Sequence, residues 1–207
     1  MRDGQRKVVA VGLTGGIGAG KSTALAFFRD LGAVTLSADE VVHGLYAQPE
    51  VAQQVGRHFG AEVLDKDGAI NRRRLAQRVQ GDRQALRWLE ELTHPRVKEA
   101  IQRIIAEAPP GSVVVCEVPL LFEAGFAPLF DLLVTIEAHP DARRRRSTHG
   151  FAPELFAEFE ALQASSERRV KGSDLAYFND GSLEELRRFV TQAYQQARGL
   201  LERPDRA

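Results

Sequence analysis

The stretch Gly15-Gly16-Ile17-Gly18-Ala19-Gly20-Lys21-Ser22 decides the fold, and Thr23 follows it directly. It matches the pattern G-x-x-x-x-G-K-[ST] at every required position. Residues 8–13 before it are apolar and suit a buried strand, and residues 23–31 after it carry apolar side chains at helical spacing. Strand, glycine loop and helix in this order are the context in which the pattern binds a nucleotide. A glycine-rich turn without a ligand would explain the glycines but not the Lys-Ser pair.

The residue types of this phosphate loop suit a polyphosphate ligand. Glycines let the backbone approach the ligand with several N–H groups pointing inward, and the N-terminus of the following helix adds a partial positive charge. Lys21, expected to be an exposed loop side chain, can bridge the β- and γ-phosphates, and the Ser22 hydroxyl can hold Mg²⁺. The predicted nucleotide contacts of the loop are Gly15, Gly16, Gly18, Ala19, Gly20, Lys21, Ser22 and Thr23.

The composition argues against several classes of protein. The 207 residues carry 28 basic and 28 acidic side chains, so the zero net charge gives no support for nucleic-acid binding. The N-terminus lacks the apolar segment of a signal peptide, and the most apolar region, residues 113–136, is interrupted by acidic residues and prolines. The single cysteine, Cys116, cannot form an internal disulfide. We therefore expect a cytoplasmic protein with neither nucleic-acid nor membrane partners.

Two acidic residues stand at the ends of predicted strands. Residues 32–37 form a second strand that ends just before Asp39, and residues 112–118 form a third strand that contains Glu117. Because ligands bind beyond the carboxyl ends of the strands in an open α/β sheet, both acids are expected near the phosphate loop. Asp39 is then either a group of the site or a helix N-cap. Glu117 is either a carboxylate that orients Mg²⁺ or its water, or a solvated residue at a strand end.

Residues 49–108 are mostly helical in pattern. We expect a helix ending near residue 59, a hairpin that turns at residues 67–68, helices capped by Asn71 and Asp82, and a further helix opened by Pro95. About sixty residues between two strands are more than a strand crossover needs. The segment is therefore either a substrate-binding insertion or a structural helical cap.

Four consecutive arginines, Arg143–Arg146, lie on a predicted helix that follows a fourth strand, residues 131–136. Such a run is usually a solvated face. Because successive helical residues point about 100° apart, at most one or two of these arginines can face a phosphate. Residues 148–171 suit a helical hairpin that closes over the nucleotide and excludes water. A short strand, residues 175–178, and an amphipathic helix, residues 183–201, complete the chain.

Beyond the phosphate loop, further motifs resemble the dephospho-CoA kinase family over nearly the whole chain. The segments that carry the resemblance are residues 12–23, Gly68-x-Ile70-Asn71-Arg72-x-x-Leu75, Leu89-Glu90-x-Leu92-x-His94-Pro95-x-Val97, Pro119-Leu120-Leu121-Phe122-Glu123 and Asp174…Asn179-x-Gly181-Ser182. The resemblance implies an α/β fold of the P-loop NTPase class. Its implied parts are a parallel-sheet nucleotide core (7–46, 111–140 and 172–203), a helical substrate-binding insertion (47–110) and a helical lid (141–171).

The resemblance also implies a reaction, in which ATP with Mg²⁺ phosphorylates the ribose 3′-hydroxyl of dephospho-CoA, the final step of coenzyme A synthesis. The implied catalytic residues are Asp39 as the base, Lys21, and Arg146 as a lid-side contact of the ATP phosphates. Asn179 is implied to bind the nucleotide, and Ser22 and Glu117 to hold the metal. The implied substrate contacts are Asp39, Arg72, Arg73, His94 and Leu120. The partners are then small molecules, and the chain is expected to be a monomer or a weak homo-oligomer.

Two positions depart from the family pattern. Ser37 stands where the family usually has the first of two aspartates, and Gly150 stands where a second lid arginine is common. Arg145 and Arg168 are candidates to replace that arginine.

Other classes of nucleotide-binding protein fit the sequence less well. A P-loop kinase for another nucleotide, a sugar or shikimate shares the loop but has no reason to share residues 94–95 and 119–123. A GTPase-like switch needs an Asn-Lys-x-Asp motif that this chain lacks. A non-catalytic nucleotide-binding module has no use for Asp39.

Overall fold

The computed structural model describes residues 8–147 and 160–202. The chain divides into two compact units, which we call the sheet unit (Met1–Ser37 and Ile101–Ala207) and the helical unit (Ala38–Ala100). No helix in the described part of the chain has both the length and the apolar character that crossing a bilayer requires.

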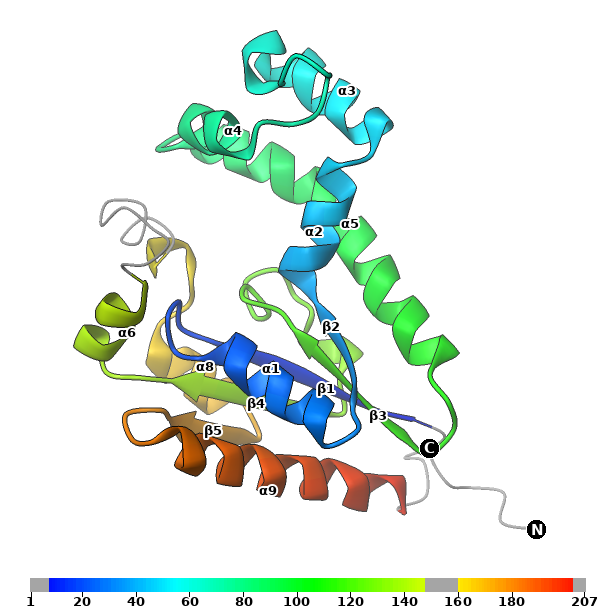
Figure 1. Ribbon diagram of the computed structural model, residues 1–207, viewed down its shortest axis with the longest axis vertical. Helices are drawn as coiled ribbons and strands as arrows, with labels where there is room; N and C mark the ends of the chain where they lie inside the picture. Colours follow the sequence, from blue (N-terminus) through cyan, green and yellow to red (C-terminus); the bar gives the residue numbers. More distant parts are fainter. Residues whose placement is uncertain (1–7, 148–159, 203–207) are drawn as a thin grey trace. The chain divides into compact units, whose positions relative to one another are not determined.

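The sheet unit is built on five parallel strands in the order β2-β3-β1-β4-β5 (Figure 1). The strands are β1 (Val8–Gly15), β2 (Val34–Ser37), β3 (Ser112–Glu117), β4 (Leu132–Glu137) and β5 (Leu175–Phe178). The apolar runs of β1, β3 and β4 are almost entirely buried, as expected of inner strands of a parallel sheet that is covered on both faces. The predicted α/β fold is confirmed.

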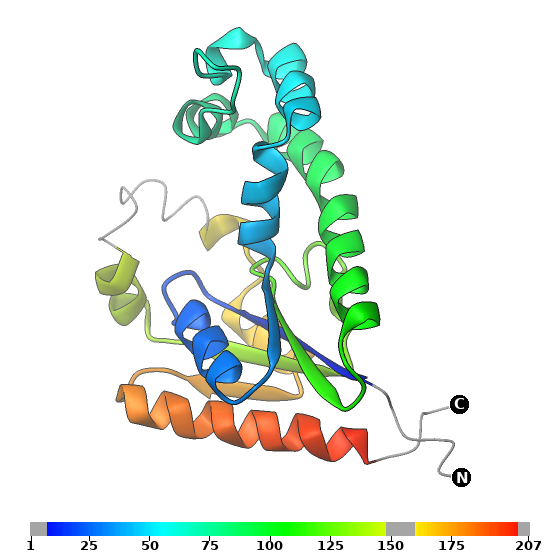
Figure 2. The same cartoon turned by 45° about the vertical axis from the view of Figure 1, so that its right-hand side comes forward.

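Helices cover both faces of this sheet. They are α1 (Lys21–Asp30), α8 (Ser166–Gly172) and α9 (Leu183–Leu201), whereas α6 (Pro140–Ser147) lies beyond the carboxyl end of β4. A short 3₁₀ turn, η2 (Ala127–Leu129), precedes β4. Helices α1 and α9 contact each other and the sheet, whereas α8 packs on β4 and β1 from behind (Figures 1 and 2). The main core lies between α1, α9 and the sheet, where Phe28, Leu186 and Val190 are fully buried or nearly so.

The helical unit contains α2 (Ala38–Tyr46), α3 (Pro49–Phe59), the 3₁₀ turn η1 (Ala61–Val63), α4 (Arg72–Val79) and most of α5 (Arg83–Glu107). It has its own core, formed by apolar residues of α3, η1, α4 and α5. The predicted caps are confirmed, because the side chain of Asn71 accepts the N–H of Arg74 and that of Asp82 accepts the N–H of Ala85. The predicted hairpin is reduced to one antiparallel bridge between Leu64 and Ile70.

The prediction that Pro95 opens a new helix is wrong, because Pro95 lies inside the continuous helix α5. A proline has no N–H, and its ring crowds the carbonyl four residues before it, here that of Glu91, so α5 continues through Pro95 without that backbone hydrogen bond. The Thr93 hydroxyl donates to the carbonyl of Leu89, and the Arg96 guanidinium donates to that of Leu92. These two bonds add side-chain donors to the turns around the proline.

The register of the sheet places the ends of three strands at one edge. Glu117 of β3 pairs with Leu13 of β1 on one side and with Ser37 of β2 on the other. The phosphate loop follows β1, and Asp39 follows Ser37 by two residues. Ligands of open α/β folds bind beyond this edge.

Candidate phosphate-binding site

The phosphate loop requires glycine at two positions for steric reasons. Gly15 has φ +144°, and a Cβ there would lie 1.8 Å from the carbonyl oxygen of Ile136. Gly20 has φ +103°, and a Cβ there would lie 2.5 Å from Nδ2 of Asn179. A side chain at Gly15 would have to displace the backbone of β4, whereas one at Gly20 would push aside the Asn179 amide and would be strained by the positive φ. These glycines therefore let the loop lie close against the rest of the sheet unit.

Lys21 is the first residue of α1, and the prediction that it is exposed is wrong. Its side chain is only 8% exposed, and Nζ donates to the carbonyl of Gly16 at 3.1 Å. The ammonium group is thus held over the loop that it helps to form. A cation in this place can meet the negative charge of a polyphosphate.

Ser22 and Glu117 are brought together from positions 95 residues apart. The Ser22 hydroxyl lies 3.5 Å from Oε1 of Glu117, and Glu117 is only 5% exposed. The alternative that Glu117 is a solvated residue at a strand end is therefore wrong. A hydroxyl and a carboxylate side by side are oxygen donors that suit Mg²⁺, whose other ligands are usually water and phosphate. Within the described ranges, no group of three or more His, Cys, Asp or Glu side chains is placed to hold a metal ion.

Asn179 supports the loop from the end of β5. Its side-chain amide donates to the carbonyl of Ala19 at 2.8 Å, and its backbone N–H donates to the carbonyl of Glu137 at 2.7 Å. Arg146, on α6, donates from Nη2 to the backbone carbonyl of Asn179 at 2.9 Å. Arg146 is therefore connected to the phosphate loop through one residue.

Arg143 has a different role from its neighbours in the arginine run. It is 8% exposed, donates to the carbonyl of Ala138, and forms an ion pair with Glu160 at 2.6 Å. The solvated face expected for the run therefore holds for Arg144, Arg145 and Arg146, which are exposed, and fails for Arg143. The two candidates to replace a second lid arginine, Arg145 and Arg168, are exposed, whereas Gly150, the position that lacks this arginine, lies outside the described residues.

Two polar side chains near the loop, one buried and one half-buried, carry no sequence signal and were not predicted. Arg169 of α8 binds both carboxylate oxygens of Glu137 at 2.6 and 3.0 Å, and these side chains are 4% and 1% exposed. Gln163, just before α8, forms hydrogen bonds with the backbone of the phosphate loop. Polar residues of this kind are found only when their partners, more than 30 positions away, are known.

The remaining predicted residues are distributed between the two units. Leu120 is half-buried in the loop after β3, within the sheet unit. Arg72 and Arg73 are exposed in the first turn of α4, and His94 is half-buried within α5. Burial lowers the pKa of His94, while the nearby carboxylate of Glu90 acts to raise it.

Asp39 is the second residue of α2, where it is exposed. Because α2 already begins at Ala38, the alternative that Asp39 is the N-cap is not supported, although an acid in the first turn still stabilises the helix. Asp39, Arg72, Arg73 and His94 belong to the helical unit, and their roles remain predictions.

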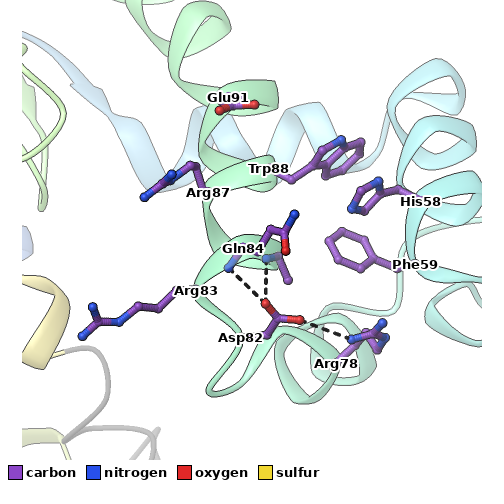
Figure 3. A pocket seen from close by; sticks show the side chains of 10 residues that line it. His58, Phe59, Arg78, Asp82, Arg83, Gln84, Arg87, Trp88 and Glu91 are labelled. Atoms are coloured by element: carbon purple, nitrogen blue, oxygen red, sulfur yellow. Dashed lines mark hydrogen bonds and ion pairs between the residues drawn. The ribbon is translucent and has the colours of Figure 1, made fainter.

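The helical unit has a pocket of about 640 Å³ between α3, α4 and the start of α5 (Figure 3). His58 stacks on Trp88 with ring centroids 4.0 Å apart, and Phe59 meets Trp88 edge-on at 5.3 Å. Arg83 and Arg87 project from α5 on the other side from Trp88, and neither forms an ion pair within the described ranges. The pocket thus offers an apolar wall and cationic groups, and sequence reasoning missed it because its aromatic residues are 30 positions apart.

The family model and the curated relatives that match this chain indicate one family. A family model described as dephospho-CoA kinase matches residues 9–185. A dephospho-CoA kinase of Aquifex aeolicus is 35% identical over 188 residues, which cover 90% of this chain and 96% of the relative. One from Streptomyces avermitilis is 37% identical and covers 88% of this chain and 91% of the relative. Among solved structures, the crystal structure of TT1252 from Thermus thermophilus is similar with a TM-score of 0.77 and 30% identity, covering 92% of this chain and 98% of the other.

Proposed function

The chain belongs to the dephospho-CoA kinase family, and on this basis we propose that it transfers the γ-phosphoryl group of ATP to the ribose 3′-hydroxyl of dephospho-CoA, giving CoA and ADP. The observation that carries the proposal is the phosphate loop, in which Lys21 and the Ser22–Glu117 pair meet at the carboxyl edge of the sheet. The P-loop kinases for nucleotides, sugars or shikimate are set aside because the family model covers residues 9–185, including the helical unit.

Phosphoryl transfer requires mainly positioning and charge neutralisation from the protein. The backbone N–H groups of the phosphate loop and the Lys21 ammonium would hold the β- and γ-phosphates. Ser22 and Glu117 would hold Mg²⁺, directly or through water, and that ion would neutralise charge on the phosphate oxygens. The 3.5 Å approach of these two side chains supports this assignment.

Arg146 is proposed to stabilise the negative charge of the transferring phosphoryl group. Asp39 is proposed to accept the proton of the attacking hydroxyl. Arg146 is connected to the phosphate loop through Asn179 and carries a guanidinium that can stabilise the transferring group. Asp39 directly follows the strand that pairs with β3 at Glu117 and can orient the attacking hydroxyl and accept its proton.

The acceptor contacts are proposed to be Arg72, Arg73 and His94 in the helical unit and Leu120 in the sheet unit. We also propose that Asn179 lies beside the bound nucleotide. We also propose a cytoplasmic enzyme, because its one cysteine, Cys116, is buried in β3 and has no second cysteine to pair with. A monomer or weak homo-oligomer is proposed for its assembly.

One assay tests the proposed function. ADP release is measured with dephospho-CoA, AMP, shikimate and gluconate as acceptors, and phosphorus NMR locates the new phosphate. Of these acceptors, we expect the enzyme to phosphorylate only dephospho-CoA, at its ribose 3′-hydroxyl. The analogue of dephospho-CoA that lacks this hydroxyl should give no turnover. The variant Lys21→Ala serves as the inactive control. Faster ADP release with any other acceptor would refute the proposed substrate.

A further inference from the structure

Gln163 makes three hydrogen bonds with backbone groups far from it in the sequence. Its Oε1 accepts the N–H of Ile17 at 3.0 Å, and its Nε2 donates to the carbonyls of Gly15 at 3.2 Å and Pro119 at 3.1 Å. Both N–H groups of the amide and one acceptor site are therefore used. The side chain spans the first part of the phosphate loop and ties it to the loop that follows β3.

The backbone that carries Gln163 is itself fixed on two sides. The N–H of Ala164 donates to the carboxylate of Glu123, and the carbonyl of Ala164 accepts from the guanidinium of Arg169. Arg169 is in turn held by the buried carboxylate of Glu137 on β4. The amide of Gln163 is thus presented to the phosphate loop from a rigid support.

From this geometry we propose that Gln163 is a positioning residue for the nucleotide, which holds the backbone from Gly15 to Ile17 in its phosphate-binding shape. A loop that binds phosphates through N–H groups must keep those groups convergent, and Gly16, which follows the last residue of β1, has no side chain that could restrain it. Because the N–H of Ile17 is bound to Gln163, it is not free to bind a phosphate, which leaves that task to other N–H groups of the loop. The inference rests on the proposed use of ATP but not on the identity of the acceptor.

The phosphate loop holds the nucleotide both before and during phosphoryl transfer. A less ordered loop should therefore bind the nucleotide more weakly in the ground state and in the transition state by the same factor. Gln163→Met keeps the length of the side chain and removes all three hydrogen bonds. We expect the KM for ATP to rise about tenfold, which corresponds to about 1.4 kcal/mol, while kcat and the KM for dephospho-CoA stay within about threefold. Gln163→Glu retains the acceptor for Ile17 but turns carboxylate oxygens toward two carbonyls, so it should raise the KM for ATP at least as much.

The control is Gln195→Met, the same change at an exposed position of α9, which should leave every constant unchanged. Calorimetry with ADP provides a measurement without any acceptor, and the affinity for ADP should fall by the same factor as the KM for ATP rises. This result separates the two proposals, since it holds whichever hydroxyl the enzyme phosphorylates. If Gln163→Met does not fold, the affinity of the Gln163→Glu variant for ADP provides the same test. An unchanged ADP affinity in a folded variant, or an equal rise in the KM for dephospho-CoA, would overturn the role of Gln163.

Discussion

Single residues in the phosphate loop act through backbone groups as much as through their own side chains. Lys21 donates to the carbonyl of Gly16, so the residue that is to meet the phosphates is already bound to the loop. A buried donor of this kind is positioned before the ligand arrives, and less conformational entropy is lost on binding. Replacement of Lys21 therefore changes both the charge of the loop and its internal order.

Asp39→Asn distinguishes a kinase from a nucleotide-binding module. The change keeps the size of the side chain and removes its charge and basicity. We expect turnover with dephospho-CoA to fall by roughly 10²–10⁴, with ATP affinity and melting temperature nearly unchanged. Calorimetry with ATP and a turnover assay on one preparation measure both.

Glu40→Gln is the matched control for this change, because Glu40 is also exposed in the first turn of α2. Both substitutions remove one negative charge near the helix N-terminus, so any loss of helix stability, about 0.3–1 kcal/mol, should be shared. Only Asp39→Asn should lose turnover. Equal turnover in the two variants would mean that Asp39 serves the helix and not the reaction.

The arginines of α6 should separate into catalytic and structural types. We expect Arg146→Ala to lower kcat by about 10³, as is usual for an arginine that stabilises transferred charge. Arg143→Ala should instead lower the free energy of unfolding by about 1–3 kcal/mol, because it leaves the Ala138 carbonyl and Glu160 without their donor. Arg144→Ala, at an exposed position, should change neither quantity. Equal losses of kcat in all three variants would indicate a diffuse basic patch.

At the level of elements, α9 has a complete capping box. The Ser182 hydroxyl accepts the N–H of Glu185 at 3.2 Å, and the Glu185 carboxylate accepts from the backbone N–H of Ser182 at 2.6 Å. The backbone N–H and the hydroxyl of Ser182 both donate to the Glu185 carboxylate, and these two bonds lower the pKa of Glu185 below its usual value of 4.5. The cap fixes the start of the helix that covers β1 and β3.

This cap predicts a pH-dependent contribution to stability. The folded-state pKa of Glu185 is lowered, so its contribution is present above pH 4.5 and is lost as the pH falls through the folded-state pKa. Ser182→Ala should cost about 1 kcal/mol at neutral pH. In Glu185→Gln, the free energy of unfolding measured with urea should depend less on pH in the acid range. Glu184→Gln, at the neighbouring exposed position, should keep the pH dependence of the unchanged protein. Identical acid dependence in the two Gln variants would contradict this role.

For the sheet unit as a whole, the Glu137–Arg169 pair joins β4 to α8 within the core. Arg169→Met should lower the free energy of unfolding by about 3–5 kcal/mol, because it leaves a buried carboxylate without its counter-charge. The double variant Glu137→Leu and Arg169→Met should recover most of the loss. Urea unfolding measures both changes.

The matched control lies on the same helix. Lys171 forms an ion pair with Glu167 at 2.8 Å, but both side chains are 76% exposed. Lys171→Met should therefore cost less than about 1 kcal/mol, the usual range for solvated pairs. A cost for Arg169→Met no larger than this would mean that the buried pair is dispensable.

The sequence alone determined those features that depend on neighbouring residues. The strand, glycine loop and helix around residues 8–31 are encoded by local pattern, and so are the caps at Asn71 and Asp82 and the amphipathic helix α9. The family assignment follows from motifs in order along the chain, and the family model confirms it. Local hydrogen bonds and helical or strand periodicity act within a few residues, so a single sequence displays them.

The tertiary structure decided which polar side chains meet. The continuation of α5 through Pro95, the burial of Lys21 and Arg143, and the Ser22–Glu117 approach depend on packing and on partners outside the local pattern. Gln163 is the clearest case, because its partner Ile17 lies 146 positions away. Hydrogen bonds over such separations form only after the chain has folded, and a single sequence carries no periodic signal of them.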